Sequence, residues 1–252
     1  MKKIFKVMAT VLASVFCFGL FAACGKGDKN EKTVTVGYTD YAPMNYTDDA
    51  GELVGFDTEL AKKAFGELGY KVRFKLIEWS NKYSELNSGT IDCIWNGFTA
   101  NVADDDGIQR SDKVDFSYNY MTNAQCVIRF ATGEELTSKE ALAGKSVAFE
   151  SSSAGDSYVS KIEGVNKKGV VSQMDAVREV NAGTAQYAVV DLLLAKSLAG
   201  KNDFANVVIN ESIVIDAEYY AIGFKKGSEL TAQINEKLEA YATNGYLAEL
   251  AA

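Results

Sequence analysis

The sequence contains no histidine. This absence excludes the commonest general base at neutral pH, the nucleophile systems that rely on a histidine partner and most zinc sites. A basic cluster is also missing, and 34 acidic against 26 basic residues give a formal net charge of −8, which disfavours binding to nucleic acid or anionic lipid. At 47% hydrophobic and 24% charged residues, the chain is globular and long enough for one large domain or two small ones.

Cysteine is scarce, with four residues in the whole chain. Cys93 and Cys126 each lie in an apolar, strand-like stretch, which is typical of buried thiols. A disulfide between them stays open, because the sequence does not show whether their Cβ atoms meet. Two cysteines without further ligands do not predict a metal site, and we expect no cofactor.

The N-terminal residues have the pattern of a short secretory signal. Three lysines among the first six residues precede the uncharged, mostly apolar residues 7–23, a run too brief and too abruptly ended to predict a membrane span. Two alanines then lead into Cys24, an ending that resembles the lipobox of bacterial lipoproteins, in which the cysteine is acylated. We predict a signal peptide over residues 1–23, a lipid-anchored tether over residues 24–31, and a location outside the cytoplasm at the cell membrane. An ordinary signal peptide with an incidental Cys24 is the alternative.

Two runs of alternating strands and helices follow. The first predicts strands at 33–38, 71–77 and 91–95, with helices at 58–68, after Asp57 as N-cap, and at 82–87. The second predicts strands at 146–149, 170–171 and 187–190, a helix opened by residues 151–153 that carries Tyr158 and Ile162, a helix at 174–180, and a closing helix at 229–243 before a frayed tail. This order predicts two α/β lobes with parallel strands, and a cleft at the carboxyl ends of those strands.

Several motifs stand in a characteristic order along this pattern. They are residues 41–44 (YAPM), 51–57 (GELVGFD), 86–92 (LNSGTID), 114–117 (VDFS), 142–147 (LAGKSV) and 182–191 (AGTAQYAVVD). With them, residues 33–247 resemble the polar amino-acid family of solute-binding proteins that feed bacterial ABC importers.

The resemblance implies a two-lobed periplasmic-binding-protein-like fold of type II. Lobe 1 would comprise residues 32–121 and 220–252, and lobe 2 residues 122–219, joined by crossings near 120–124 and 219–222 that hinge shut on the ligand. The implied function is capture of a free amino acid, polar or sulfur-containing, for delivery to ABC permease subunits in the membrane. The resemblance implies a monomer without catalytic residues.

A zwitterion in a closed cleft needs a cation for its carboxylate, and arginine offers a bidentate fork. Arg110 lies seven positions before Ser117, where the family keeps its carboxylate-binding arginine. The chain departs from the family by extra residues over 100–109, including Asp104, which either displace Arg110 or bulge outward. A surface position for Arg110 is the alternative.

The ammonium group needs an anion and further oxygen atoms. The resemblance places Asp191 as the ammonium-binding carboxylate, with the Gly97 carbonyl and the Thr99 hydroxyl as acceptors; a cap on the helix that follows is the alternative role of Asp191. Across the cleft, Ser152, Ser153 and Ala154 open a helix whose N–H groups can meet the carboxylate.

Aromatic and acidic residues complete the expected site. Trp79 and Tyr41 fall where the family places aromatic side chains around the ligand, although either can be ordinary core. Tyr38 stands where basic-amino-acid binders tend to have an aspartate, which counts against a lysine or arginine ligand. Glu150, at the end of a strand, either faces solvent or faces the ligand, where it would repel an acidic ligand. These residues favour a neutral polar or sulfur-containing amino acid.

Two other functions remain open. Some proteins on this scaffold are dehydratases or lyases, for which Glu150 or Asp191 would have to serve as the acid or base. The cleft can also belong to a surface lipoprotein that senses its ligand instead of transporting it.

Overall fold

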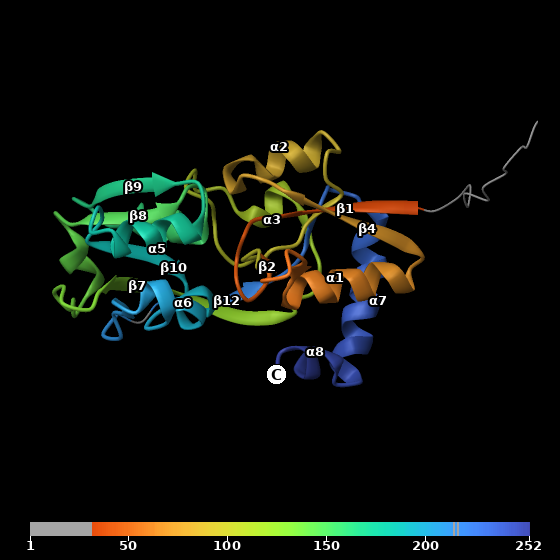
Figure 1. The fold of residues 1–252 in the computed structure, drawn as a ribbon. Coiled ribbons are helices and arrows are strands. Elements are labelled where there is room, and N and C mark those ends of the chain that lie inside the picture. The colour runs from red at the N-terminus through yellow and green to blue at the C-terminus, as the bar shows by residue number, and fades with distance from the viewer. Residues whose placement is uncertain (1–31, 214, 216) are drawn as a thin grey trace, which may run out of the picture. The chain divides into compact units, whose positions relative to one another are not determined.

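The computed structural model describes residues 32–213, 215 and 217–252, all within one compact unit that spans Glu31–Ala252. The predicted signal peptide, tether and Cys24 lie outside the described residues. No helix in this described part is long and apolar enough to cross a membrane. Two separate β-sheets organise the unit, and each forms the centre of one lobe (Figure 1).

The sheet of lobe 1 has the strand order β4-β1-β5-β13-β6. β1 (Lys32–Tyr38) lies between β4 (Tyr70–Leu76) and β5 (Cys93–Ile94) and runs parallel to both, which confirms the predicted parallel arrangement. β13 (Gly223–Phe224) returns late in the chain and pairs antiparallel with β5 and with β6 (Asp115–Phe116). Lobe 1 is therefore built from both ends of the described chain.

The helices of lobe 1 follow from apolar spacing and from glycines at their ends. In α1 (Phe56–Glu67) the side chains of Leu60, Ala61, Ala64 and Phe65 form one fully buried face, and Gly69 just beyond the helix takes a positive φ of 79°. The remaining elements are the hairpin β2 (Tyr46–Thr47) and β3 (Leu53–Val54), the 3₁₀ helix η1 (Trp79–Asn81), α2 (Lys82–Asn87), α3 (Arg110–Lys113), α7 (Glu229–Thr243) and α8 (Tyr246–Leu250).

The sheet of lobe 2 has the order β11-β7-β10-β8-β9. β8 (Ser146–Glu150) runs parallel to β10 (Tyr187–Asp191) and to β9 (Asn166–Val170). β7 (Met121–Phe130) runs antiparallel to β10 and to β11 (Val207–Ile209). The other elements are α4 (Ala154–Val159), α5 (Gln173–Asn181), α6 (Leu192–Leu198) and the 3₁₀ helices η2 (Lys139–Leu142) and η3 (Asn202–Phe204).

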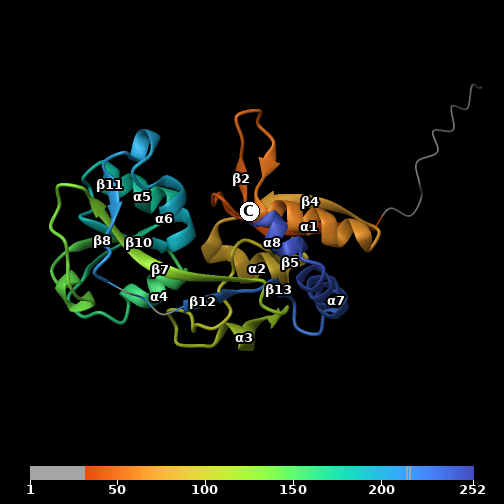
Figure 2. The ribbon, with the colours of Figure 1, turned by 90° about the horizontal axis from the view of Figure 1, so that it is seen from below.

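Two paired strands connect the lobes. β7 leaves lobe 1 after β6, and β12 (Ala217–Tyr220) returns from lobe 2 before β13, with Ala217 opposite Ala124 and Tyr220 opposite Met121. Figure 2 shows both strands running between the two groups of helices. They overlap the predicted crossings near 120–124 and 219–222, so the path of the chain places any hinge at or beside this ribbon.

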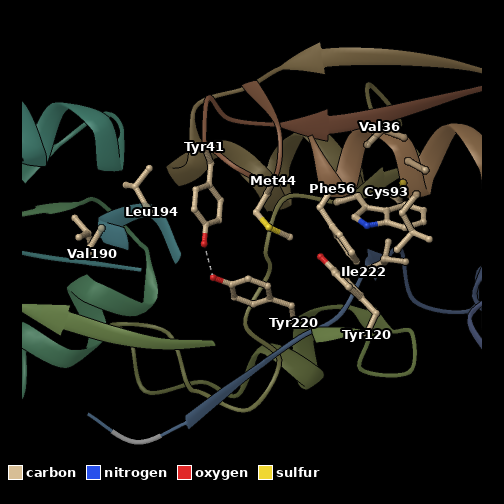
Figure 3. Close-up of a cluster of buried hydrophobic side chains, with 14 of the residues drawn as sticks. Val36, Tyr41, Met44, Phe56, Cys93, Tyr120, Val190, Leu194, Tyr220 and Ile222 are labelled. Atoms are coloured by element: carbon tan, nitrogen blue, oxygen red, sulfur yellow. Dashed lines mark hydrogen bonds between the residues drawn. The ribbon is translucent and has the colours of Figure 1, made fainter. Parts of the chain in front are cut away.

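A cluster of aromatic and aliphatic side chains lies beside the connecting strands (Figure 3). The hydroxyl groups of Tyr41 and Tyr220 are 2.6 Å apart and share a hydrogen bond, and both side chains are buried. The rings of Phe56 and Tyr120 stack with their centres 6.1 Å apart. These side chains fill the space beneath the loop after β5, which carries part of the site.

Several local expectations were wrong. Helix α1 begins at Phe56 after Gly55, so Asp57 lies inside the helix and its carboxylate does not cap it. Helix α4 ends at Val159, before Ile162, and the tail expected to be frayed contains the helix α8. Cys93 and Cys126 are free, buried thiols on strands of different sheets, so the structure contains no disulfide between them.

Candidate functional site

A small polar cavity of about 10 Å³ lies between the lobes. Its lining comes from both lobes and consists of Trp79, Asn96, Gly97, Thr99, Arg110, Glu150, Ser153, Ala154, Gln173 and Asp191. Asn96 and Gln173 are the lining residues that sequence reasoning missed, whereas Tyr41 and Ser152 were expected but do not line the cavity.

Arg110 lies at the start of α3 and is buried. Its Nε donates to Oδ1 of Asp104 at 2.7 Å, and its Nη1 donates to the carbonyl oxygen of Thr99 at 3.0 Å. The guanidinium also lies 5.2 Å from the centre of the Phe98 ring. Nη2 has no hydrogen-bond partner among the described residues. Arg110 lines the cavity, and a buried guanidinium with one unpaired nitrogen suits a carboxylate.

The extra residues before Arg110 leave it in the cavity lining: residues 105–109 are exposed, and Asp104 is buried. A bridge between Ala103 and Gln109 closes the loop, and Asp104 turns inward with its side chain 2% exposed. Besides Arg110, its carboxylate accepts from Tyr83 Oη at 2.7 Å and from Lys113 Nζ at 2.8 Å. The insert therefore orients Arg110 through a buried ion pair.

Asp191 ends β10 and stands at the N-cap position of α6, but its side chain makes no capping hydrogen bond. Oδ1 accepts from the amide groups of Asn123, at 3.0 Å, and of Gln125, and Oδ2 accepts from Gln173 Nε2 at 2.6 Å. The backbone N–H of Asp191 donates to Gln173 Oε1 at 2.8 Å. Burial raises the pKa of this carboxyl, and hydrogen bonds from the surrounding amides and tyrosines oppose that rise. The capping alternative is thus wrong.

Glu150 ends β8 and is 2% exposed, so the solvent-facing alternative is also wrong. Its Oε1 has no hydrogen-bond partner among the described residues. Burial raises the pKa of Glu150 to about 8; the nearby Asp191 adds to the rise, and Lys82 and Arg110 oppose it.

Asp57, which the sequence predicted as a helix N-cap, holds the loop that carries Gly97 and Thr99. Asp57 Oδ2 accepts from the Gly97 N–H at 2.7 Å and from Tyr120 Oη at 3.0 Å. Gly97 has a φ of 57°, and a Cβ there would come within 2.6 Å of the Tyr41 ring. Tyr41 therefore packs against the loop at Gly97 and supports it.

The hydroxyl group of Thr99 donates its proton within the protein and can accept a hydrogen bond from a ligand. Its Oγ1 donates to Glu218 Oε2 at 3.1 Å, and Gln125 Nε2 donates to the same carboxylate oxygen at 3.0 Å. The hydroxyl proton is thereby engaged, and the lone pairs of Oγ1 remain as acceptors, the polarity that an ammonium group requires.

The helix α4 offers fewer free amide groups than expected. The N–H of Ser152 donates to Asp156 Oδ2 at 2.9 Å, and that of Ser153 donates to the Glu150 carbonyl oxygen at 3.2 Å. Ser152 has a φ of 61°, a conformation that glycine adopts more readily. Of the three expected helix-opening residues, Ser153 and Ala154 line the cavity.

Lys82 joins the two lobes and was missed because a lysine in a short helix is ordinarily exposed. It is 1% exposed, and its Nζ donates to the carbonyl oxygen of Ser152 at 2.9 Å. The same ammonium lies 5.0 Å from the centre of the Trp79 ring. Burial, together with the neighbouring Arg110, lowers the pKa of Lys82 to about 7.

Two lobes around a polar cavity with one arginine and two buried acids define a type II binding-protein architecture. Residues 34–252 match the bacterial extracellular solute-binding proteins, family 3, so the chain belongs to that family.

Curated relatives and solved structures agree with this assignment. The arginine-binding extracellular protein ArtP of Bacillus subtilis (strain 168) is 27% identical, covering 97% of this chain and 96% of its own. The L-cystine-binding protein TcyA of the same organism is 27% identical, covering 95% and 93%. An ancestral arginine-binding protein bound to arginine superposes with a TM-score of 0.79 at 30% identity, covering 87% of this chain and 96% of that one. An ancestral amino acid-binding protein described as a precursor of cyclohexadienyl dehydratase gives a TM-score of 0.75 at 27% identity, covering 86% and 93%.

Proposed function

We propose that this protein binds a free amino acid in the interlobe cavity and delivers it to the permease of an ABC importer. The observation that carries the proposal is the opposition of Arg110 and Asp191 across one cavity. Arg110 offers a free Nη2 for the α-carboxylate, and Asp191 offers its carboxylate to the α-ammonium. Each charge of a zwitterion thus meets an opposite charge in a buried site.

The relatives support this class of ligand. ArtP and TcyA are named for arginine and for cystine, and this chain aligns with nearly the whole length of each. The assigned family is one of extracellular binding proteins, which agrees with work outside the cytoplasm. Acylation of Cys24 would hold the monomeric protein at the membrane within reach of the permease.

A binding screen tests the function. Isothermal titration calorimetry of the purified protein against the standard amino acids and cystine should find at least one ligand with a dissociation constant in the micromolar range or below. Absence of binding by all of them would contradict the proposal. Labelling of cells with a fatty-acid probe, with Cys24→Ala as the control, tests the anchor separately.

An enzyme on the same scaffold is the second candidate. One structural neighbour is described as a precursor of a dehydratase, and Glu150, with its pKa raised to about 8, is an acid that can hold a proton at neutral pH. Recovery of an unchanged amino acid after prolonged incubation with the protein supports binding alone. Conversion of the ligand would make the protein an enzyme.

A further inference from the structure

The charged groups of the cavity do not balance. Arg110 is the cationic side chain of the lining, whereas Glu150 and Asp191 contribute two acids. The charge of Arg110 is already shared with the buried Asp104 at 2.7 Å. A zwitterion would engage Arg110 with its carboxylate and Asp191 with its ammonium, and would leave Glu150 without a partner.

Glu150 has no structural role that accounts for its burial. Its Oε1 lacks a hydrogen-bond partner, and no salt bridge joins its carboxylate to another described residue. Lys82, whose charge acts on Glu150, directs its Nζ to the Ser152 carbonyl oxygen at 2.9 Å. Asp191, by contrast, has three side-chain amides as donors. A buried acid without donors favours its protonated form, and a cation from a ligand would stabilise the ionised carboxylate instead.

We propose that Glu150 is the subsite for the ligand's side chain and that it selects an amino acid with a second positively charged group, a guanidinium or an ammonium. This inference rests on the proposed function and specifies its ligand class. It departs from the expectation of a neutral polar or sulfur-containing ligand drawn from the sequence. Tyr38 had counted against a basic ligand because a family aspartate is missing there; Glu150 supplies a carboxylate from the opposite lobe.

The aromatic lining of the cavity is also suited to a cationic ligand side chain. Trp79 lines the same cavity and already accepts one ammonium, that of Lys82, at 5.0 Å from its ring centre. An acidic or a neutral ligand side chain would leave Glu150 protonated and without an ion pair, and an acidic one would also be repelled by Asp191. A cationic side chain pairs with Glu150 and lies beside an aromatic face.

Matched ligands of different charge test the proposal. Calorimetry should compare L-arginine with L-citrulline, which replaces the guanidinium by a neutral urea group, and L-lysine with L-norleucine. We expect the cationic member of at least one pair to bind about tenfold more tightly or better. Glu150→Gln should reduce that preference to about threefold or less. Glu134→Gln, the same change at a side chain that is 64% exposed, should leave it unchanged.

The outcomes separate this inference from the proposed function. Tight binding of neutral amino acids alone, or a cationic preference that survives Glu150→Gln in a folded variant, would overturn the role of Glu150 and leave the proposed function intact. No binding of any amino acid would overturn both. Cystine carries a second ammonium, so cystine binding that weakens in Glu150→Gln supports the subsite, and cystine binding that does not weaken contradicts it.

Discussion

The Asp104 carboxylate and the Arg110 guanidinium form an ion pair of 2.7 Å in which the two side chains are 2% and 1% exposed. Asp104 belongs to the extra residues that distinguish this chain from the pattern it resembles. The pair leaves Nη2 of Arg110 as the nitrogen available to a ligand. The extra residues before Arg110 therefore help to position this arginine in the site.

Asp104→Asn removes the charge that holds Nε of Arg110, so we expect ligand affinity to fall by about tenfold, since a hydrogen bond to a charged group contributes about 1.5–3 kcal/mol. The measurement is calorimetric titration with the ligand found by screening. Asp105→Asn, next to it and exposed, is the matched control and should bind normally. Equal affinity of both variants would show that Asp104 does not position Arg110.

Arg110→Ala should abolish amino-acid binding while the fold survives. A carboxylate left unpaired in a buried cavity costs several kcal/mol. The fold should tolerate the loss because Lys113 and Tyr83 still donate to Asp104. Titration and circular dichroism are the measurements, and Arg178→Ala, at a side chain that is 61% exposed, is the control. Affinity within a few-fold of the parent protein would remove Arg110 from the site.

Asp191→Asn should weaken binding by more than tenfold and change the melting temperature little. The substitution removes the negative charge that faces the ligand ammonium and keeps the side-chain shape. The surrounding amides of Asn123, Gln125 and Gln173 can rotate to accept from the new NH₂ group. Calorimetry and thermal unfolding measured together decide the matter. A lower melting temperature with unchanged affinity would assign Asp191 a purely structural role.

Stability of the ligand-free protein should fall as the pH rises from 5 to 7. Burial raises the pKa of Glu150 to about 8 and those of Asp57 and Glu218 to about 7. These groups bind protons more tightly when folded, so the stability they contribute at low pH is lost as pH rises through these values, by up to about 1.4 kcal/mol per pH unit for each group. Lys82, with its pKa lowered to about 7, acts in the opposite direction mainly above pH 7.

Chemical denaturation at several pH values measures this slope. Glu150→Gln cannot titrate and should show a shallower fall between pH 5 and 7 than the parent protein. Glu134→Gln should reproduce the parent slope, because its side chain is exposed. Identical slopes in all three proteins would show that Glu150 does not hold a proton in the folded state.

Lys82→Met should weaken ligand binding by about tenfold, because it removes a charged hydrogen bond between the lobes. Ligand should lower the radius of gyration of the parent protein as the lobes close about β7 and β12, and lower it less in this variant. Small-angle scattering with and without saturating ligand measures both effects. Lys62→Met, at a side chain 45% exposed, is the control. A radius of gyration that ligand leaves unchanged in the parent would count against hinge closure.

Much of the fold was accessible from local pattern. Alternating apolar residues identified β1 and β4, an apolar run identified β8, and the spacing in α1, α5 and α7 identified helices to within about two residues of their observed ends. These signals are local, because a strand or helix face must repeat with the period of its backbone. The start of α1 was predicted wrongly because the side chain of Asp57 has a partner far away in the sequence. Asp57 accepts a hydrogen bond from the Gly97 N–H instead of capping α1.

The sequence by itself determined the class of fold, the absence of histidine chemistry and the residue types from which a zwitterion site can be built. The tertiary structure alone decided which way those residues face. Glu150 and Lys82 have ordinary surface chemistry, yet both are buried where the lobes meet, and Tyr41 supports a loop in place of lining the cavity. The burial and the hydrogen-bond partners of a side chain depend on contacts between segments far apart in the chain, such as that of Lys82 with Ser152. Local sequence patterns do not predict such contacts.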